Sequence, residues 1–240
     1  MSTTSLKTFI KNYLRKIYYY KQTLQLNTYE KFSKNERELC FLKLLKYLVN
    51  NRPMTGNYFE FGSHSGRTFR CALKYFGNQS FFNRTNNTKF YAFDSFEGLP
   101  KTIENDEQEI WGEGKFKTSL ENFKKILRKD GYENENYELV KGFYHDTLTK
   151  NLKKRLLTEG HAAIVYIDCD LYYSTVPVLN FIKDFLKDGS LIVFDDWYLF
   201  NNRKDKGQQK AWYEFLEKNP DITATSFFSN AEIKVFIINK

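Results

Sequence analysis

The stretch AAIVYIDCDLYYSTVPVLNFIKDFLKDGSLIVFDDWY, residues 162–198, decides the fold of this chain. Two short apolar runs in it, Ala162 to Ile167 and Leu191 to Phe194, are typical of fully buried parallel strands. The segment between them has the pattern of a helix and would cross from one strand to the next. The stretch therefore predicts an α/β domain with a doubly wound, mostly parallel sheet.

Acidic side chains follow both of these strands. Asp168 and Asp170 come after the first, and Asp195 and Asp196 come after the second. The carboxyl ends of parallel strands meet at one edge of the sheet, where open α/β sheets bind ligands, so we expect these carboxylates to converge. Converging carboxylates repel one another unless a cation lies between them, which predicts a hard divalent cation with oxygen ligands. The alternative is that these residues cap helices or form solvated turns.

A second motif lies upstream, in NYFEFGSHSGRTFRCALKYFG. Tyr58 to Phe61 is predicted as a strand, Gly62 to Gly66 as a tight turn and Arg67 to Phe76 as a helix. The two glycines permit close backbone approach, and N–H groups at the start of the helix can hold a carboxylate or a phosphate. Only two of the three glycines of a dinucleotide fingerprint are present, so NAD binding is not favoured.

The next predicted strand, in KFYAFDSFEGLP, ends at Asp94. An acidic residue at the end of the second strand is well placed to accept hydrogen bonds from both hydroxyl groups of an adenosine ribose. A helix cap or a turn is the alternative role for this residue.

Five motifs, in this order and spacing, resemble the macrocin O-methyltransferase (TylF) type of class I S-adenosylmethionine-dependent methyltransferases: EFGSHSG, FDSFEGLP, KGFYHDTL, YIDCDLYYST and FDDW. The resemblance covers roughly residues 56–212, and DSFEGLP and the DxD-LY-ST run are its most specific parts. It implies a Rossmann-like methyltransferase domain over residues 56–240, with a seven-stranded, mostly parallel sheet. Residues 1–55, which the resemblance does not cover, are predicted as a basic helical extension. The implied activity is methyl transfer from S-adenosylmethionine to a hydroxyl of a sugar, in a glycosylated small molecule or a glycan.

The resemblance also implies roles for individual residues. The implied cofactor contacts are Glu60, Gly62, Ser63, Gly66, Asp94, Ser95, Gly142 and Phe143. Magnesium would be bound by Asp168, Asp195 and Asp196 and would polarise the acceptor hydroxyl. We expect Asp168 to take the proton of that hydroxyl, with the metal supplying most of the activation because an ordinary carboxylate is a weak base.

Two other classes of function stay open at this point. A metal-dependent glycosyltransferase could use the DxD motif to bind a metal and a sugar nucleotide, but this leaves the glycine turn, Asp94 and the Asp195/Asp196 pair unexplained. A non-catalytic protein that binds an adenosine ligand would need the cofactor pocket and no metal.

Positive charge is concentrated at the N-terminal end of the chain. Residues 1–56 contain 11 Lys/Arg and 3 Asp/Glu, whereas residues 57–240 contain 26 of each. Apolar residues recur at helical spacing within this basic segment: Leu6, Phe9, Ile10, Tyr13, Leu14, Ile17 and Tyr18. The pattern predicts a basic amphipathic helix.

Such a helix can pack its apolar stripe on the rest of the protein or on a second subunit, or it can lie on an anionic membrane surface. We expect a homo-oligomer, with peripheral membrane contact as the alternative. Nucleic acid is not expected as a partner, because the chain has no zinc-finger, basic-zipper or RNA-recognition motif.

The composition fits one globular domain, with 240 residues of which 41% are hydrophobic. The three cysteines, Cys40, Cys71 and Cys169, lack metal-ligand spacing and are expected to be reduced and buried. No apolar stretch approaches the roughly 18 residues of a membrane span, and no signal-peptide core is present. We therefore expect a cytoplasmic protein.

The remaining elements complete one domain. Helices are predicted over residues 33–50, 118–129 and 206–217, a strand over 137–140, and a terminal hairpin over 223–228 and 233–238. Residues 101–117 are predicted as a mobile lid over the cofactor or an ordinary solvated loop. His64 and His145 are each expected to make polar loop contacts, with a role as general base as the alternative.

Overall fold

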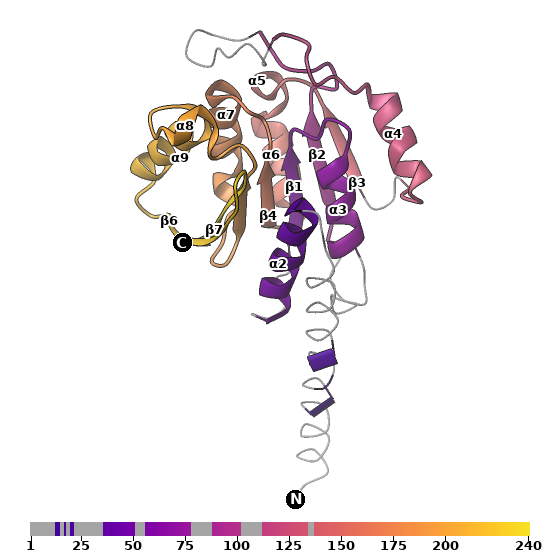
Figure 1. Cartoon of the computed structure of the whole chain (residues 1–240), viewed down its shortest axis with the longest axis vertical. Coiled ribbons are helices and arrows are strands. Elements are labelled where there is room, and N and C mark those ends of the chain that lie inside the picture. The colour runs from indigo at the N-terminus through magenta and orange to yellow at the C-terminus, as the bar shows by residue number, and fades with distance from the viewer. Residues whose placement is uncertain are drawn as a thin grey trace, which may run out of the picture. The chain divides into compact units, whose positions relative to one another are not determined.

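A computed structural model describes the protein over residues 13, 14, 17, 20, 21, 36–50, 56–77, 88–101, 112–133 and 137–240 (Figure 1). The chain divides into two compact units. One comprises Met1–Met54 and Lys74–Asn86, and the other comprises Thr55–Leu73 and Asn87–Lys240. The predicted boundary between an extension over residues 1–55 and a methyltransferase domain over residues 56–240 stays a prediction.

The described part of the second unit contains a seven-stranded sheet with the order β3-β2-β1-β4-β5-β7-β6. Its strands are β1 (Asn57–Phe61), β2 (Phe90–Asp94), β3 (Tyr137–Lys141), β4 (Ala162–Ile167), β5 (Leu191–Phe194), β6 (Thr223–Ser229) and β7 (Lys234–Asn239). Strands β1 to β5 run parallel, and β7 runs antiparallel to β5 and β6. The predicted doubly wound, mostly parallel sheet with a terminal hairpin is confirmed.

Helices follow the strands in alternation, as a doubly wound sheet requires (Figure 1). The described helices are α2 (Glu36–Asn50), which precedes β1, and α3 (Arg67–Phe76), α4 (Leu120–Lys129), α5 (Tyr144–Thr147), α6 (Lys150–Leu157), α7 (Tyr172–Ile182), α8 (Leu199–Asn202) and α9 (Gly207–Lys218). A short 3-10 helix, Lys183–Phe185, follows α7. The crossover predicted between β4 and β5 is therefore α7 with this extension.

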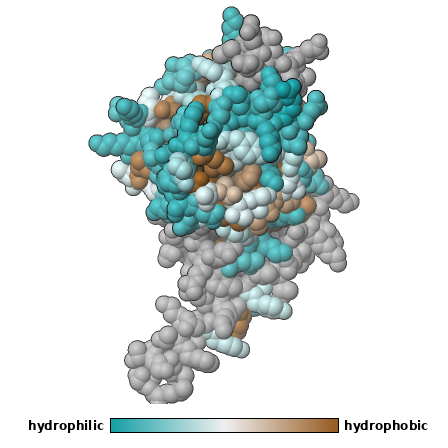
Figure 2. Space-filling view, turned by 90° about the vertical axis from the view of Figure 1, so that its left-hand side faces the viewer, coloured by the Kyte–Doolittle hydropathy of each residue, from teal (hydrophilic) through white to brown (hydrophobic). Residues whose placement is uncertain are grey.

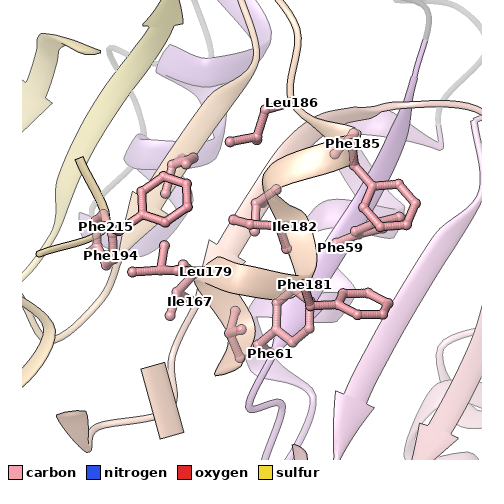
Figure 3. Close-up of a cluster of buried hydrophobic side chains, with 14 of the residues drawn as sticks. Phe59, Phe61, Ile167, Leu179, Phe181, Ile182, Phe185, Leu186, Phe194 and Phe215 are labelled. Atoms are coloured by element: carbon pink, nitrogen blue, oxygen red, sulfur yellow. The ribbon is translucent and has the colours of Figure 1, made fainter. Parts of the chain in front are cut away.

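The central strands are apolar on both faces because helices cover both faces. β1, β4 and β5 are buried along their whole length. Side chains alternate along a strand, so Phe59 meets the ring of Phe185 at 5.1 Å on one face, while Tyr58 meets Phe69 of α3 at 6.2 Å on the other. Figure 3 shows the first of these layers, in which β1, β4 and β5 pack against α7 and α9. This packing explains why the strands appear in the sequence as continuous apolar runs.

The sheet ends in an edge strand within the described residues. β6 is the outermost strand and most of its residues are exposed. Figure 2 faces the side of the molecule that carries β6, β7 and α9, and it shows apolar surface surrounded by hydrophilic surface. Tyr213 of α9 and Phe227 of β6 are among the exposed aromatic residues. The hairpin therefore extends the sheet on this side and leaves part of its apolar surface exposed.

Two predicted helix boundaries are wrong by one or two residues. α4 begins at Leu120 rather than at residue 118, because the Ser119 hydroxyl accepts a hydrogen bond from the Asn122 N–H at 3.3 Å and so caps the helix. α9 begins at Gly207 rather than at residue 206. Residues 33–35 of the predicted helix over residues 33–50 and residues 102–111 of the predicted lid lie outside the described residues.

In the first unit, α2 buries one apolar side, formed by Cys40, Phe41, Leu42, Leu44, Leu45, Leu48 and Val49. Glu38 of α2 accepts hydrogen bonds from the Lys74 ammonium, at 2.7 Å, and from the Tyr75 hydroxyl. The three cysteines form no disulfide with one another. Cys40 and Cys169 are buried, but the expectation of burial was wrong for Cys71, which is partly exposed.

The predicted N-terminal helix is described at a few positions only. Tyr13, Leu14, Ile17 and Tyr20 are helical, with exposed fractions of 58%, 59%, 38% and 66%. The rest of the predicted stripe lies outside the described residues. Among the helices that are described, none combines the length and the apolar character needed to cross a membrane.

Candidate active site

The predicted site residues gather at one edge of the sheet, where β1, β2, β4 and β5 end. The sheet register aligns Phe61 with Phe93 of β2 and with Ile167 of β4, and Ile167 with Phe194 of β5. The residues that follow these positions therefore leave the sheet side by side, at the upper end of the strands in Figure 1. They are Gly62, Asp94, Asp168 and Asp195. The prediction that the acids following β4 and β5 lie at one edge of the sheet is confirmed, and the glycine turn lies at the same edge.

The glycine turn contacts the acidic loop directly through its first residue. Gly62 has a φ of +85°, and a β-carbon on it would lie 1.7 Å from the Asp168 carbonyl oxygen. The Asp168 N–H also donates to the Phe61 carbonyl at 2.8 Å. Only glycine fits at residue 62, because both the backbone angle and the space exclude a side chain. At the other end of the turn, Gly66 has a φ of +71° and packs on the Phe123 ring.

Asp94 binds the backbone of the glycine turn. Its Oδ2 accepts hydrogen bonds from the N–H groups of Ser63, at 2.7 Å, and His64, at 3.0 Å. Its Oδ1 accepts from the Phe96 N–H at 2.6 Å. The N–H groups of Ser63 and His64 in the turn are thus bound by a carboxylate of the adjacent strand. The predicted binding of an anion by N–H groups at the start of the helix, which begins at Arg67, stays a prediction. The predicted contact of Asp94 with a ribose stays a prediction.

Glu60 lies behind the turn and is fully buried. Its Oε2 accepts a hydrogen bond from the Tyr58 hydroxyl at 2.5 Å, and its Oε1 accepts one from the Thr68 hydroxyl at 3.0 Å. Burial raises the pKa of the Glu60 carboxyl from 4.5 to about 8, although these two hydrogen bonds lower it. Glu60 thus joins β1 to the first turn of α3, and its predicted contact with the cofactor stays a prediction.

The Ser63 hydroxyl is the part of the turn best placed for a ligand. Its oxygen is buried, and no hydrogen bond to it is found among the described residues. The Ser63 hydroxyl lies near the Glu60 carboxyl and lowers the pKa of that carboxyl. A buried hydroxyl without a partner is costly unless a ligand or water satisfies it. This observation fits a polar group of a cofactor at the turn.

The ends of β2 and β3 form the next wall of the site. The Gly142 N–H donates to the Asp94 carbonyl at 2.9 Å, and Phe143 is the N-cap residue of α5. Ser95 donates from its hydroxyl to the Gly98 carbonyl at 2.7 Å. These three predicted cofactor contacts therefore lie close along the chain or the sheet to Asp94, but their contact with the cofactor stays a prediction.

Three of the four acidic residues form a cluster. Asp168, Asp195 and Asp196 each offer an oxygen, and these oxygens lie within 4.8 Å of one another. Asp170 is not part of this group, so the prediction that all four carboxylates converge was wrong for it. Its backbone has a φ of +57°, and its N–H donates to Asp196 Oδ2 at 3.2 Å. Asp170 thus contributes its backbone to the site.

Neutral groups orient the carboxylates of this cluster. Asp195 is 3% exposed, and its Oδ1 accepts a hydrogen bond from the buried Tyr166 hydroxyl at 2.6 Å. Gln208, at the start of α9, accepts from the Asp196 N–H at 3.2 Å. Such partners hold the carboxylates in place without balancing their negative charge. Three oxygen ligands of this kind fit a hard divalent cation such as magnesium.

Gln208 and Tyr166 are the contributors that sequence reasoning missed. Tyr166 lies inside an apolar strand, where it is indistinguishable by pattern from a core residue. Gln208 lies at the start of a predicted helix, and its only signal is a pair of adjacent amides, GQQ, in a segment whose neighbours are charged. His64 and His145 do not belong to the acidic cluster: His64 is in the turn with a φ of +39°, and His145 is in α5.

Comparison with known proteins identifies a family. A family model described as macrocin-O-methyltransferase (TylF) matches residues 42–224. This match spans the glycine turn, Asp94, the acidic cluster and Gln208. No sequence match is found among curated proteins.

Several solved structures share the fold. The O-methyltransferase NovP superposes with a TM-score of 0.66 at 19% identity, covering 85% of this chain and 80% of NovP. The calicheamicin methyltransferase CalS11 has a TM-score of 0.64 at 18% identity, covering 90% of this chain and 91% of CalS11. An O-methyltransferase from Bacillus cereus in complex with SAH has a TM-score of 0.54 at 11% identity, covering 92% and 91% of the two chains. All three support the class I methyltransferase fold.

Proposed function

Because the chain belongs to the macrocin O-methyltransferase (TylF) family, and is thus an S-adenosylmethionine-dependent O-methyltransferase, we propose that it methylates a hydroxyl of a sugar-containing acceptor with the help of magnesium. The observation that carries this proposal is the direct contact between the glycine turn and the acidic cluster through Gly62 and Asp168. It brings a predicted cofactor site and a predicted metal site to the same point of the sheet edge.

Different residues of the chain would bind the cofactor, bind the metal and accept the proton. Ser63, Asp94 and Gly142 would hold the cofactor at the ends of β1, β2 and β3. Asp168, Asp195 and Asp196 would hold magnesium, which when bound acts as a Lewis acid that lowers the pKa of an acceptor hydroxyl. Asp168 would then accept the proton of that hydroxyl.

Alignment is the main contribution expected from the protein. Methyl transfer requires the acceptor oxygen to lie in line with the sulfonium carbon and its leaving sulfur, and such alignment can replace a large part of the entropic cost of the reaction. The rigid backbone contact of Gly62 with Asp168 is suited to this task, because it leaves little freedom between the two halves of the site.

A sugar acceptor is supported by the family and by the structural neighbours. One structure of CalS11 is described as a TDP-rhamnose 3'-O-methyltransferase, and it has a TM-score of 0.58 with this chain at 18% identity. The glycosyltransferase alternative is not favoured, because the matching family is one of methyltransferases. A non-catalytic adenosine-binding role is not favoured for the same reason.

The N-terminal segment is proposed as a docking element of a cytoplasmic enzyme. Tyr13, Leu14, Ile17 and Tyr20 are exposed at helical spacing, which supports a surface that meets a partner. We propose a second copy of the chain as that partner, and an anionic membrane surface as the alternative occupant.

A binding panel tests the proposed function. Calorimetry with S-adenosylmethionine, a uridine sugar nucleotide and magnesium should show binding of the first and the third. Binding of the sugar nucleotide but not of S-adenosylmethionine would favour a glycosyltransferase. Binding of S-adenosylmethionine together with a failure to bind magnesium would contradict the metal-assisted mechanism.

A further inference from the structure

The amide of Gln208 joins the two strand ends that carry the acidic cluster. Its Nε2 donates to the carbonyl of Ile167, the last residue of β4, at 3.2 Å. Its Oε1 accepts the N–H of Asp196, just beyond β5, at 3.2 Å. The same Nε2 lies 3.4 Å from Asp196 Oδ2. One side chain thus contacts the residue before Asp168 and both the backbone and the carboxylate of Asp196.

The Asp196 carboxylate is held from two directions. Its Oδ2 meets the Gln208 amide on one side and the backbone N–H of Asp170, at 3.2 Å, on the other. Asp170 adopts a left-handed backbone conformation, with a φ of +57°, which is uncommon for a residue with a side chain and costs free energy. That cost is tolerated in a conformation that directs an N–H group at a carboxylate of the cluster.

The next residue along α9 provides an internal comparison. Gln209 is 3% exposed, and Gln208 is 2% exposed. Gln209 Nε2 donates to the Trp197 carbonyl at 2.7 Å and to Asn202 Oδ1 at 2.6 Å. It thus anchors the same loop one residue further on, and neither of these two partners belongs to the acidic cluster. The two glutamines are adjacent in α9 and almost equally buried, but their partners differ.

We infer that Gln208 is a positioning residue of the acidic cluster, fixing the orientation of the Asp196 carboxylate and its distance from Asp168 for a divalent cation. This inference rests on the proposed metal-assisted function and adds a residue to it. A neutral amide suits the task, because it offers one donor and one acceptor at once and adds no charge to a group of three carboxylates. Partners that orient metal ligands in this way typically change metal affinity by about 10- to 100-fold when removed.

The test compares Gln208→Met with Gln209→Met, which replace equally buried amides by an unbranched apolar side chain. Mn²⁺ alone is the probe, with binding followed by electron paramagnetic resonance and calorimetry on the full chain. Binding of S-adenosylhomocysteine and thermal unfolding are measured for both variants. Gln208→Asn, which shortens the amide by one methylene so that it cannot bridge both strand ends, serves if Gln208→Met does not fold.

Gln208→Met and Gln208→Asn should bind Mn²⁺ roughly 10- to 100-fold more weakly than the wild type while S-adenosylhomocysteine affinity is kept. A high Mn²⁺ concentration should restore most of the methyl-transfer kcat. Gln209→Met should keep its Mn²⁺ affinity even if it is less stable. Wild-type Mn²⁺ affinity in the folded Gln208 variants, or an equal loss in Gln209→Met, would overturn the inference. If the wild type itself bound no Mn²⁺, the proposed metal site would fail, and the inference with it.

Discussion

Gly62 and Asp168 contact each other through their backbones so closely that a β-carbon on Gly62 would lie 1.7 Å from the Asp168 carbonyl oxygen. One residue begins the turn predicted to hold the cofactor, and the other is the first acid of the proposed metal site. The contact joins the two halves of the proposed site directly. A change at residue 62 should therefore disturb both halves at once.

Gly62→Ala is expected to destabilise the protein by about 2 kcal/mol or more, since it combines a left-handed backbone angle with a clash against backbone. It should weaken the binding of both S-adenosylhomocysteine and Mn²⁺. Gly131→Ala is the matched control, because Gly131 has a φ of +82° and nothing within 4 Å of its added β-carbon. Thermal unfolding and calorimetry measure both effects. If Gly62→Ala bound both ligands normally, the described coupling would be wrong.

Asp94→Ala should weaken S-adenosylhomocysteine binding by roughly 10- to 100-fold, because hydrogen bonds to a charged group are lost. Because Asp94 also accepts the N–H groups of Ser63 and His64, the variant should be less stable as well. Asp94→Asn, which keeps one acceptor oxygen, should lose less stability. Calorimetry and thermal unfolding separate the two effects. An unchanged affinity in Asp94→Ala would argue against a ribose contact.

Glu60 should make the stability of the protein depend on pH. Its carboxyl has a pKa of about 8 in the folded chain against 4.5 for an ordinary glutamate, so the folded state binds the proton more tightly than the unfolded state. The free energy of unfolding should therefore fall as the pH rises from about 4.5 to about 8. Glu60→Gln should flatten this part of the stability profile. Glu97→Gln, at an exposed ion pair with Lys141, should leave the profile nearly as in the wild type. Equal slopes for wild type and Glu60→Gln in chemical denaturation would contradict the assignment.

Deleting residues 1–22 tests the proposed docking element. If this segment joins two copies of the chain, the truncated protein should change from oligomer to monomer in sedimentation or light scattering, with cofactor binding kept. If it lies on a membrane, the deletion should instead abolish sedimentation with anionic vesicles. A milder variant, Leu14→Ser with Ile17→Ser, should act in the same direction because both side chains are exposed. An unchanged oligomeric state, together with no vesicle binding by the full chain, would exclude both occupants.

The sheet could be predicted from the sequence because its central strands are buried on both faces. That burial makes segments such as Ala162–Ile167 continuous apolar runs, and the acids that follow them must meet at one edge. This argument predicts the convergence of Asp168, Asp170, Asp195 and Asp196, and the resemblance to the family implies the metal ligands Asp168, Asp195 and Asp196. The match to the motifs around Asp94 then identified the family.

The contacts that orient the site could not be predicted in the same way. Gln208 reaches Asp196 only because α9 packs against the end of β5, a tertiary contact that leaves no periodic signal in the sequence. The left-handed backbone of Asp170 likewise removes its carboxylate from the predicted cluster and brings its N–H into it. Helix caps such as Ser119 shift the observed boundaries by one or two residues, because the same residue type can stand at the cap or in the first turn of a helix.

The acidic cluster is tested by three substitutions, each of which replaces one carboxylate by an uncharged amide of nearly the same size. Asp195→Asn and Asp196→Asn should weaken Mn²⁺ binding and slow methyl transfer, while S-adenosylhomocysteine still binds. Asp168→Asn should be more damaging, since it removes a ligand and the proposed base together, and loss of a general base alone typically slows a reaction by about two to four orders of magnitude.

The most direct measurement of the central claim is methyl transfer from S-adenosylmethionine to a sugar-bearing acceptor, followed for the wild type and Asp168→Asn with and without a chelator. The wild type should lose activity in chelator and regain it when magnesium is added in excess. Asp168→Asn should remain slow under every condition. Full wild-type activity in chelator, or a fully active Asp168→Asn protein, would contradict the metal-assisted mechanism at this cluster.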